Sequence, residues 1–284
     1  MSIIKNLSLS IGLVALGLSL QAQNQTSCCM AATNTGEFSQ FAKDQNFKAA
    51  HEEPIPFILE NPKGKMVTFP ITGGKAGNAY MVKANPTSDK YIFVIHEWWG
   101  LNDYIKQEAD KLAEAIGANV LALDMYDGKL ATTREEAAAA MQAVDEKRAE
   151  SIVLGAKNFA GKNAKIATIG WCFGGGWSLR SSLLLGDQAK ACIIYYGNTI
   201  NDAEKLANLK APVLGIFASQ DAWINPEMVE GFKTAMTAAS KKVEVNMYNA
   251  DHAFANPSNP KYDAKATQDA WMKSLNFLMK NLFE

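Results

Sequence analysis

Residues 165–175 read KIATIGWCFGG, and this stretch decides the fold of the 284-residue chain. An apolar run leads into a Gly-x-Cys-x-Gly sequence, after which residues 176–185 are typical of a helix. This is the pattern of a nucleophile elbow, a tight strand-to-helix turn that presents one side chain above a sheet. Gly170 and Gly174 fit because larger residues there would clash with neighbouring backbone. We therefore predict that Cys172 is a nucleophile, with an inert cysteine in a glycine-rich turn as the alternative.

A cysteine nucleophile of this type needs a base, and the chain has only three histidines. His51 lies in a polar region flanked by prolines, where we expect no strand or helix to position it. His96 ends an early strand. Only His252 follows a late strand, which is where a Cys…Asp…His order places the base. His252 is therefore the predicted base.

The acid that orients this base is expected one strand earlier. Residues 213–218 form an apolar run, and Asp221 follows it. The alternative for Asp221 is a turn aspartate that caps the helix beginning near Pro226. Asp251 is a competing acid, but it is adjacent to His252 and therefore a poor partner for the ring. We expect Asp251 to shape its own loop.

Apolar runs alternate with amphipathic segments along most of the chain, which is typical of a mostly parallel sheet covered on both faces. Two runs on either side of Gly73-Gly74 predict an antiparallel pair before this alternation. The predicted site residues all follow carboxyl ends of strands, where such sheets bind ligands. We expect an α/β fold with strands at 66–72, 79–84, 91–95, 120–123, 165–169, 191–196, 213–218 and 243–248, and helices at 103–116, 133–159, 176–185, 226–239 and 262–282.

Glu97 ends a buried strand beside two tryptophans, so we expect it to be partly desolvated with a raised pKa. Such a carboxylate can accept a proton from a thiol near neutral pH. The alternative is a glutamate that is hydrogen-bonded to loop N–H groups. The adjacent His96 is expected to be structural. The histidines are far apart in sequence and no Cys-x-x-Cys pair exists, so we expect no metal and no cofactor.

Five separated strings resemble the dienelactone hydrolase family of the α/β-hydrolase fold over roughly residues 65–284: HEWWG at 96–100, DMY at 124–126, GWCFGG at 170–175, SQD at 219–221 and DHAF at 251–254. The resemblance implies that Cys172, Asp221 and His252 form a triad. It also implies that Glu97 contacts the resting thiol and helps to take its proton. The backbone N–H groups of Trp98 and Phe173 would form the oxyanion hole. The expected activity is hydrolysis of an ester or lactone through a thioester.

Two departures from the family bear on the substrate. Members that cleave dienelactone hold its carboxylate with two arginines, whereas here Lys129 stands one place beyond the first and Asn256 takes the second. Neither residue can form a bidentate clamp, so we do not expect the anionic substrate to carry over. Aromatic side chains are expected to line the pocket, although they are equally suited to the core; they are Trp98, Trp99, Tyr126 and Trp223.

The N-terminus predicts a signal peptide at residues 1–23, because Lys5 precedes an uncharged apolar run at 7–20 that small and polar residues follow. We expect export to the periplasm or outside the cell; an uncleaved anchor or a lipid at Cys28 are alternatives. Residues 24–62 are polar and end in proline-rich turns, which predicts an extension or linker. The catalytic domain is expected at 63–284.

The formal net charge of −1 gives no reason to expect nucleic acid or an anionic membrane surface as a partner. We expect a small-molecule ester or lactone, and no stable membrane span once the signal peptide is cleaved. Two other functions remain open. One is a ligand-binding protein that kept a hydrolase fold. The other is a thiol redox protein, although no resolving cysteine is evident near Cys172.

Overall fold

Eight strands of the described chain form one sheet in the order β1-β2-β4-β3-β5-β6-β7-β8. The structure is a computed structural model that describes Met1 and residues 40–284. Strand β2 is antiparallel to both of its neighbours, and every other pair of adjacent strands is parallel. The strands are β1 Lys65–Phe69, β2 Gly77–Val82, β3 Lys90–Ile95, β4 Asn119–Leu123, β5 Lys165–Trp171, β6 Ala189–Tyr195, β7 Val213–Ala218 and β8 Val243–Tyr248. The expected α/β fold and its antiparallel opening pair are confirmed.

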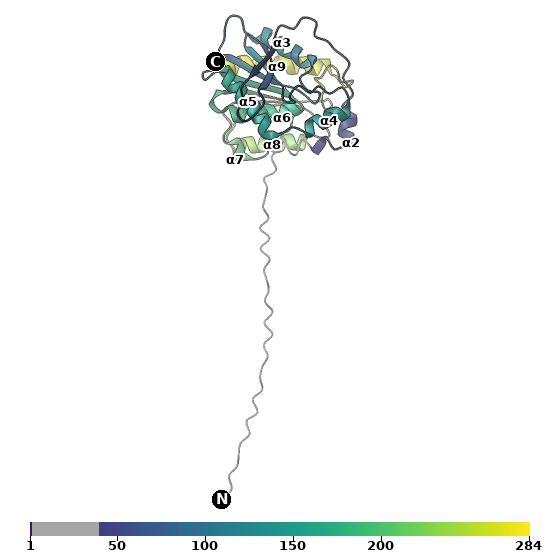
Figure 1. Ribbon diagram of the computed structural model, residues 1–284. Helices are drawn as coiled ribbons and strands as arrows, with labels where there is room; N and C mark the ends of the chain where they lie inside the picture. Colours follow the sequence, from purple (N-terminus) through teal and green to yellow (C-terminus); the bar gives the residue numbers. More distant parts are fainter. Residues whose placement is uncertain (2–39) are drawn as a thin grey trace. The chain divides into compact units, whose positions relative to one another are not determined.

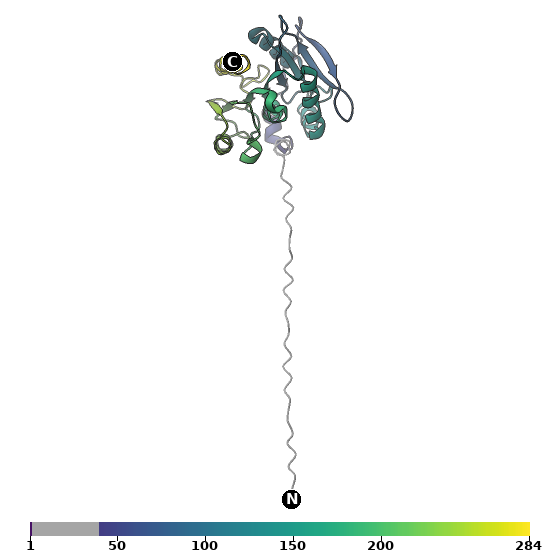
Figure 2. The ribbon, with the colours of Figure 1, turned by 90° about the vertical axis from the view of Figure 1, so that its left-hand side faces the viewer.

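Helices cover both faces of this sheet (Figures 1 and 2). Helices α3 and α9 pack together on one face, and α5 and α6 pack together on the other. Strands β4 and β7 are buried along their whole length because both of their faces are covered, whereas the edge strands β1 and β8 are partly exposed. The helices are α2 Gln45–Ala50, α3 Asp103–Ile116, α4 Arg134–Gln142, α5 Glu146–Ala160, α6 Phe173–Leu185, α7 Ala203–Leu206, α8 Pro226–Ala238 and α9 Ala264–Phe283, with a short 3-10 turn η1 Gly186–Gln188.

The order of the strands reverses next to β3. The chain runs from β3 through α3 to β4 on one side, and then through α4 and α5 to β5 on the other side. Because parallel crossovers are right-handed, this reversal places α3 and α5 on opposite faces. The carboxyl ends of β3 and β5 are therefore adjacent at a point where open α/β sheets bind ligands.

The single helix that we predicted at residues 133–159 is two helices. Helix α4 ends at Gln142, and Asp145 is the N-cap of α5, where its side chain accepts a hydrogen bond from the N–H of Arg148. Aspartate favours such an N-cap over a helix interior, so the run of helix-forming residues is interrupted there. The short helices α2 and α7 had not been predicted, because a helix of six residues or fewer shows too little periodicity to detect.

Residues 41–52, which we call the roof segment, pack against the carboxyl edge of the sheet. The segment contains α2, whose N-cap Asp44 accepts a hydrogen bond from the N–H of Asn46. Side chains from three other parts of the chain bind it: Gln142 donates to the carbonyl of Ala42, Trp223 donates to Asp44, and Arg134 donates to the carbonyl of His51. The roof segment is therefore anchored near both of its ends.

Within residues 40–284, no helix combines the length and the apolar character that a membrane span requires. The predicted signal peptide lies outside the described residues.

Candidate active site

The nucleophile elbow is present at the end of β5. Cys172 has φ 52° and ψ −117°, a conformation that non-glycine residues rarely adopt, and its N–H is held by the carbonyl of Tyr195 at 3.0 Å. A side chain at Gly170 would meet the backbone of Gly174, and one at Gly174 would meet the carbonyl oxygens that end β3. Both glycines are therefore required by the close approach of the strand and helix α6.

Asp221 and His252 meet as the sequence argument expected. The Nδ1–H of His252 donates to Oδ2 of Asp221 at 2.6 Å, and both side chains are buried. The other oxygen of Asp221 accepts the N–H groups of Trp223 and Ile224, each at 2.9 Å. The N-cap of α8 is Asn225, so Asp221 is not the cap that we had weighed as its alternative. Asp251 pairs with Lys261 instead.

Cys172 lies beside the imidazole of His252, on the side of the ring that Asp221 does not bind. Its sulfur and one ring nitrogen of His252 are within 4.8 Å of each other, and Nδ1 of His252 is already occupied by Asp221. The Nε2 atom of His252 is buried and has no hydrogen-bond partner in the described part of the chain. The proton acceptor of the imidazole therefore faces the thiol.

The profile of the dienelactone hydrolase family matches residues 78–282. The chain belongs to the dienelactone hydrolase family. This confirms the resemblance that the five strings had indicated, and it makes the chain a hydrolase of a family that acts on ester bonds.

Two related proteins align with this chain over nearly their whole length. Protein usf of Aquifex pyrophilus is 29% identical over 239 residues, covering 77% of this chain and 99% of its own. A protein of Aquifex aeolicus, provisionally named carboxymethylenebutenolidase, is 28% identical over 228 residues, covering 75% of this chain and 97% of its own.

Solved structures show the same fold at lower identity. A dienelactone hydrolase-like promiscuous phosphotriesterase from metagenomic libraries has a TM-score of 0.67 at 23% identity, covering 78% of this chain and all of that one. A crystal structure assigned to a dienelactone hydrolase of Klebsiella pneumoniae has a TM-score of 0.65 at 22% identity, covering 75% of this chain and 98% of that one. These likenesses establish the α/β-hydrolase fold.

Burial and neighbouring charges together set the proton affinities of Cys172 and His252. Burial raises the pKa of the Cys172 thiol, and the opposing contributions of His252 and the Phe173 N–H do not overcome it. Burial disfavours the imidazolium form of His252, but the negative charges of Asp221 and Cys172 outweigh it and raise the pKa of His252 well above its usual value. The thiol therefore gives up its proton reluctantly, and the imidazole beside it is a strong acceptor for that proton.

Glu97 is buried beside the site but is paired with other side chains. Its carboxylate accepts a hydrogen bond from the hydroxyl of Tyr196 at 3.1 Å and another from the amide of Asn256 at 2.5 Å. Burial raises the pKa of Glu97 to about 7, against the lowering effects of Tyr196, His252 and Asn256. The raised pKa agrees with the sequence argument. The partners differ from the loop N–H groups that we had considered.

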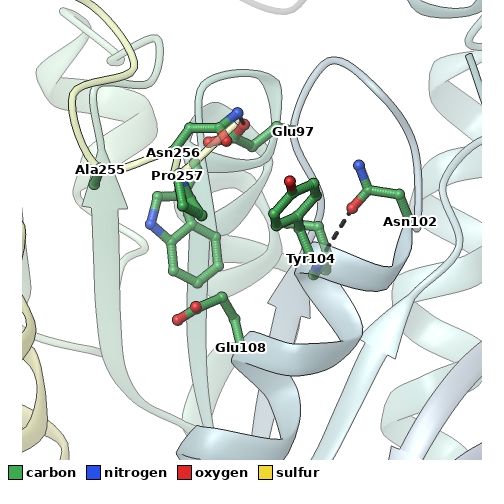
Figure 3. Close-up of a pocket in the computed structure, with 9 residues that line it drawn as sticks. Glu97, Asn102, Tyr104, Glu108, Ala255, Asn256 and Pro257 are labelled. Carbon is green, nitrogen blue, oxygen red and sulfur yellow. Dashed lines mark hydrogen bonds between the residues drawn. The ribbon is translucent and has the colours of Figure 1, made fainter. Parts of the chain in front are cut away.

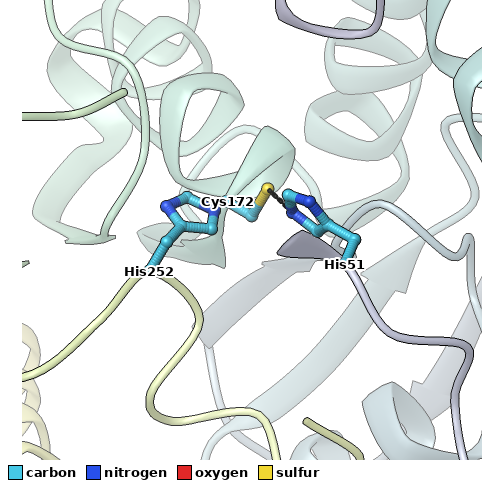
Figure 4. A group of neighbouring side chains, drawn as sticks. All are labelled: His51, Cys172 and His252. Carbon is cyan, nitrogen blue, oxygen red and sulfur yellow. Dashed lines mark hydrogen bonds between the residues drawn. The ribbon is translucent and has the colours of Figure 1, made fainter. Parts of the chain in front are cut away.

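His51 was set aside in the sequence argument, yet the structure brings it to the thiol. Its Nε2 atom lies 3.8 Å from Sγ of Cys172 (Figure 4). Its Nδ1–H donates to the carbonyl of Phe47 at 2.7 Å. His51 is the C-cap of helix α2, which positions its ring against the face of Trp98. Burial lowers the pKa of His51 to about 3, so the ring is neutral and its lone pair faces the sulfur.

Two signals in the sequence could have drawn attention to residues that we missed. Asp44 followed by six helix-compatible residues is a weak N-cap pattern that leads to His51. Tyr196 follows the carboxyl end of β6, the same edge that carries the other site residues.

His96, the third histidine, has a structural position. Its Nδ1–H donates to the carbonyl of Glu97 at 2.8 Å, and its Nε2 accepts the N–H of Met125 at 3.2 Å. Burial lowers its pKa to about 4, so the ring is neutral. His96 therefore joins the ends of β3 and β4, and its ring also contacts Tyr126 and Phe173.

The residues predicted to bind substrate differ in burial and in whether other side chains already bind them. Trp98, Trp99 and Tyr126 are buried, and Trp223 is partly buried with its ring 6.1 Å from that of His252. Lys129 is exposed. Asn256 is committed to Glu97 through its amide nitrogen and to Ser258 through its oxygen. The nearby Arg148 is paired with Asp127, so it is engaged by the protein itself.

A pocket opens beside Glu97 and encloses about 410 Å³ when its open part is included (Figure 3). Its lining within the described chain includes Glu97 and Asn256, but neither Cys172 nor His252. The Cys172 side chain is only 1% exposed because the roof segment covers it: Phe47 contacts the rings of Trp98, Trp223 and His252. In this conformation the roof segment therefore shields the thiol from solvent.

Proposed function

We propose that the chain hydrolyses an ester or lactone through a Cys172–His252–Asp221 triad. The observation that carries this proposal is the 2.6 Å bond between His252 and Asp221, which leaves the Nε2 lone pair of the imidazole unpartnered beside the sulfur of an elbow cysteine. A nucleophile, a base and an orienting acid in this arrangement are the requirements of acyl transfer.

The reaction begins when the thiol proton passes to His252 and the sulfur attacks the carbonyl carbon. Asp221 stabilises the imidazolium that forms. The N–H groups of Trp98 and Phe173 receive the negative charge of the tetrahedral oxygen. Support for the second donor comes from the position of Phe173, the first residue of α6 directly after Cys172, whose N–H lowers the pKa of the thiol.

Collapse of the tetrahedral species breaks the bond to the alcohol, which leaves with the proton of His252. Water that is then activated by His252 attacks the thioester and restores the thiol. In a lactone the alcohol and acid remain in one molecule. The free enzyme is regenerated in either case.

Glu97 acts as a second proton acceptor near the thiol in this proposal. Its pKa of about 7 suits that role, and its negative charge contributes to the raised pKa of Cys172. Before it can contact the sulfur, Glu97 must release Tyr196 or Asn256, whose hydrogen bonds hold it at rest. Arrival of substrate is the event that would exchange these partners.

The preferred substrate in this proposal carries no carboxylate next to its reacting ester. Lys129 is exposed, Asn256 is bound to Glu97, and Arg148 is bound to Asp127, so no arginine fork is offered by these residues. The aromatic surroundings of Cys172 favour an apolar acyl or alcohol group. We expect a neutral aryl ester to be cleaved faster than its carboxylated analogue.

The test is to trap the acyl-enzyme. The protein is mixed with a p-nitrophenyl ester, quenched in acid at early times and digested, and the peptide that carries Cys172 is weighed by mass spectrometry. An acyl mass on Cys172 that forms and decays at the turnover rate supports the thioester. Turnover with no acylated peptide at any time would overturn it. Tight binding of esters without turnover would favour a binding protein instead.

The exported location is also a proposal, because it rests on residues 1–23 alone. Fractionation of cells that express the full chain tests it. Recovery of a shortened protein outside the cytoplasm supports export, and recovery of the full-length protein in the cytoplasm contradicts it.

A further inference from the structure

Three side chains that are distant in sequence meet at one buried point. The sulfur of Cys172 lies between the imidazoles of His51 and His252, whose ring centroids are 5.3 Å apart (Figure 4). The sulfur and one nitrogen of each ring are all within 4.8 Å of one another. The triad needs only one of these histidines, so the presence of the second calls for an explanation.

Both imidazoles are fixed in the same tautomer. His51 uses its Nδ1–H to bind the carbonyl of Phe47, and His252 uses its Nδ1–H to bind Asp221. In each ring, Nε2 is consequently the atom with the lone pair. A ring that donates Nδ1–H to a carbonyl or carboxylate and presents Nε2 is the usual state of a metal-ligating histidine.

One of these lone pairs lacks any partner. Nε2 of His252 is buried and makes no hydrogen bond within the described residues, although a buried nitrogen of this kind normally has one. The His252 side chain is 5% exposed, so solvent does not supply the missing partner readily. The unpaired atom points toward the sulfur and toward His51.

We propose that Cys172, His51 and His252 form a site for a divalent cation of the zinc class, and that the bound ion holds the hydrolase inactive. One thiolate and two imidazoles are a donor set that suits Zn²⁺, which binds sulfur and nitrogen ligands tetrahedrally. Three protein ligands leave one position for water. The roof segment supplies one of the three, so binding also holds the roof over the thiol.

The dimensions fit such an ion after a small adjustment. Zinc with bonds of about 2.3 Å to sulfur and 2.05 Å to nitrogen spans about 3.6 Å between these ligand atoms in a tetrahedral site. The Sγ–Nε2 distance between Cys172 and His51 is 3.8 Å. The widest separation in the cluster, 4.8 Å at most, must shorten by about 1.2 Å for a sulfur–nitrogen pair or about 1.5 Å for the two nitrogens, so the side chains must rotate toward the ion.

The binding step is balanced without any redox change. The thiol of Cys172 loses its proton to solvent, the sulfur and the two Nε2 atoms each donate a lone pair to the ion, and the hydrated ion releases all but one of its water ligands to solvent. The ion then occupies the electron pairs that hydrolysis needs, on the nucleophile and on the base. Removal of the ion by a chelator returns the proton to the thiol and restores the site.

Sequence spacing could not reveal this cluster. His51 and Cys172 are separated by 121 positions, and the fold brings them together through a segment that precedes the first strand of the sheet. Our expectation of no metal was based on spacing along the chain, which reports only sites whose ligands come from one short motif.

The experiment uses Co²⁺ as a spectroscopic substitute for Zn²⁺. The full chain, free of a histidine tag and with Cys28→Ser and Cys29→Ser, retains only two of its four cysteines, Cys172 and Cys192. Co²⁺ is titrated into the reduced protein, and the thiolate-to-cobalt charge-transfer absorption in the near ultraviolet is recorded. We expect one ion per chain, loss of the band on addition of Zn²⁺, and loss of ester turnover that a chelator reverses.

Two variants and one control locate the site. Cys172→Ala should abolish the band, and His51→Gln should weaken Co²⁺ binding on the order of 100-fold, at least as much as loss of an outer-shell partner can. Cys192→Ser is the matched control, since this second buried cysteine lies near Ser178 instead. It should leave the band unchanged. A band that persists in Cys172→Ala, or an affinity that is unchanged in His51→Gln, would overturn the site.

A crystal of the wild-type protein soaked in Zn²⁺ gives an answer that does not depend on how the variants fold. An anomalous peak bonded to Cys172, His51 and His252 supports the site, and a peak elsewhere or no peak overturns it. Full turnover with zinc bound at the three residues would overturn the inhibition. The absorption band reports ligation and not catalysis, so it tests this inference even if Cys172 is not the nucleophile of the hydrolase.

Discussion

The Sγ atom of Cys172 and the Nε2 atom of His51 lie 3.8 Å apart, but the fold positions the two residues in different ways. Cys172, Asp221 and His252 follow the ends of β5, β7 and β8, whose parallel pairing holds them at one edge of the sheet. His51 is the C-cap of a six-residue helix that lies outside the sheet. Side chains such as Arg134 and Trp223 hold this roof segment in place. The sheet fixes the chemical groups, whereas a separately anchored segment covers them.

This contrast separates catalysis from access. A substitution at the sheet edge should remove turnover while the roof segment stays closed, and a substitution in the roof segment should expose the thiol without removing the nucleophile. The following predictions test each side, beginning with the largest effect.

Loss of the nucleophile should have the largest effect. We expect Cys172→Ala to lower kcat/KM for a p-nitrophenyl ester by about 10⁴-fold, because no other group in the triad can form the thioester. Cys192→Ala deletes the same atom from a buried cysteine that takes no part in the site. It should keep the wild-type rate. Equal loss in both variants would mean that the sulfur atoms matter for folding and not for chemistry.

Asp221→Asn should lower kcat by about 10³-fold while the fold is kept. The asparagine amide would donate to Nδ1 of His252, which moves the ring proton to Nε2 and leaves no lone pair facing the thiol. The backbone bonds from Trp223 and Ile224 to Oδ1 can remain. Steady-state kinetics with circular dichroism on the same samples measures this. A variant that turns over at the wild-type rate would exclude Asp221 as the orienting acid.

The sequence could predict the residues at the sheet edge because the positions of the strands along the chain are visible as apolar runs. Apolar runs located β5, β7 and β8, and Cys172, Asp221 and His252 follow them directly. It could not locate His51, since a helix as short as α2 shows no clear period and its position depends on contacts with Trp98 and Arg134 from elsewhere in the fold. The partners of Glu97 were hidden for the same reason: Tyr196 and Asn256 are 99 and 159 positions away.

Glu97 should make stability depend on pH in a defined window. Its pKa rises from 4.5 to about 7 on folding, chiefly through burial, with Tyr196, Asn256 and His252 opposing and Glu108 adding to the rise. Both states are protonated below pH 4.5. Between pH 4.5 and about 7 the unfolded state ionises first, so stability falls by about 3 kcal/mol and stays lower above that range.

Chemical denaturation of the wild type and of Glu97→Gln at several pH values measures this term. The amide cannot ionise but can still pair with Tyr196 and Asn256. As pH rises from 4.5 to 7, the wild type should therefore lose unfolding free energy relative to Glu97→Gln. A difference that is constant across this window would mean that Glu97 is ionised in the folded protein throughout it.

The smallest effect is expected from Phe47→Ala, a substitution in the roof segment. Phe47 packs against Trp98 and Trp223, so its removal weakens the closed position of the roof segment, and a loss of about 1.4 kcal/mol raises the open fraction about 10-fold. The rate at which iodoacetamide labels Cys172, followed by peptide mass spectrometry, should rise by that factor, because the thiol is 1% exposed when closed. Phe159→Ala deletes the same side chain from α5, where it is 40% exposed and contacts Phe69, and should leave the labelling rate unchanged. If both variants label at the wild-type rate, the roof segment does not control access, and the thiol must be reached from another side, such as past Glu97.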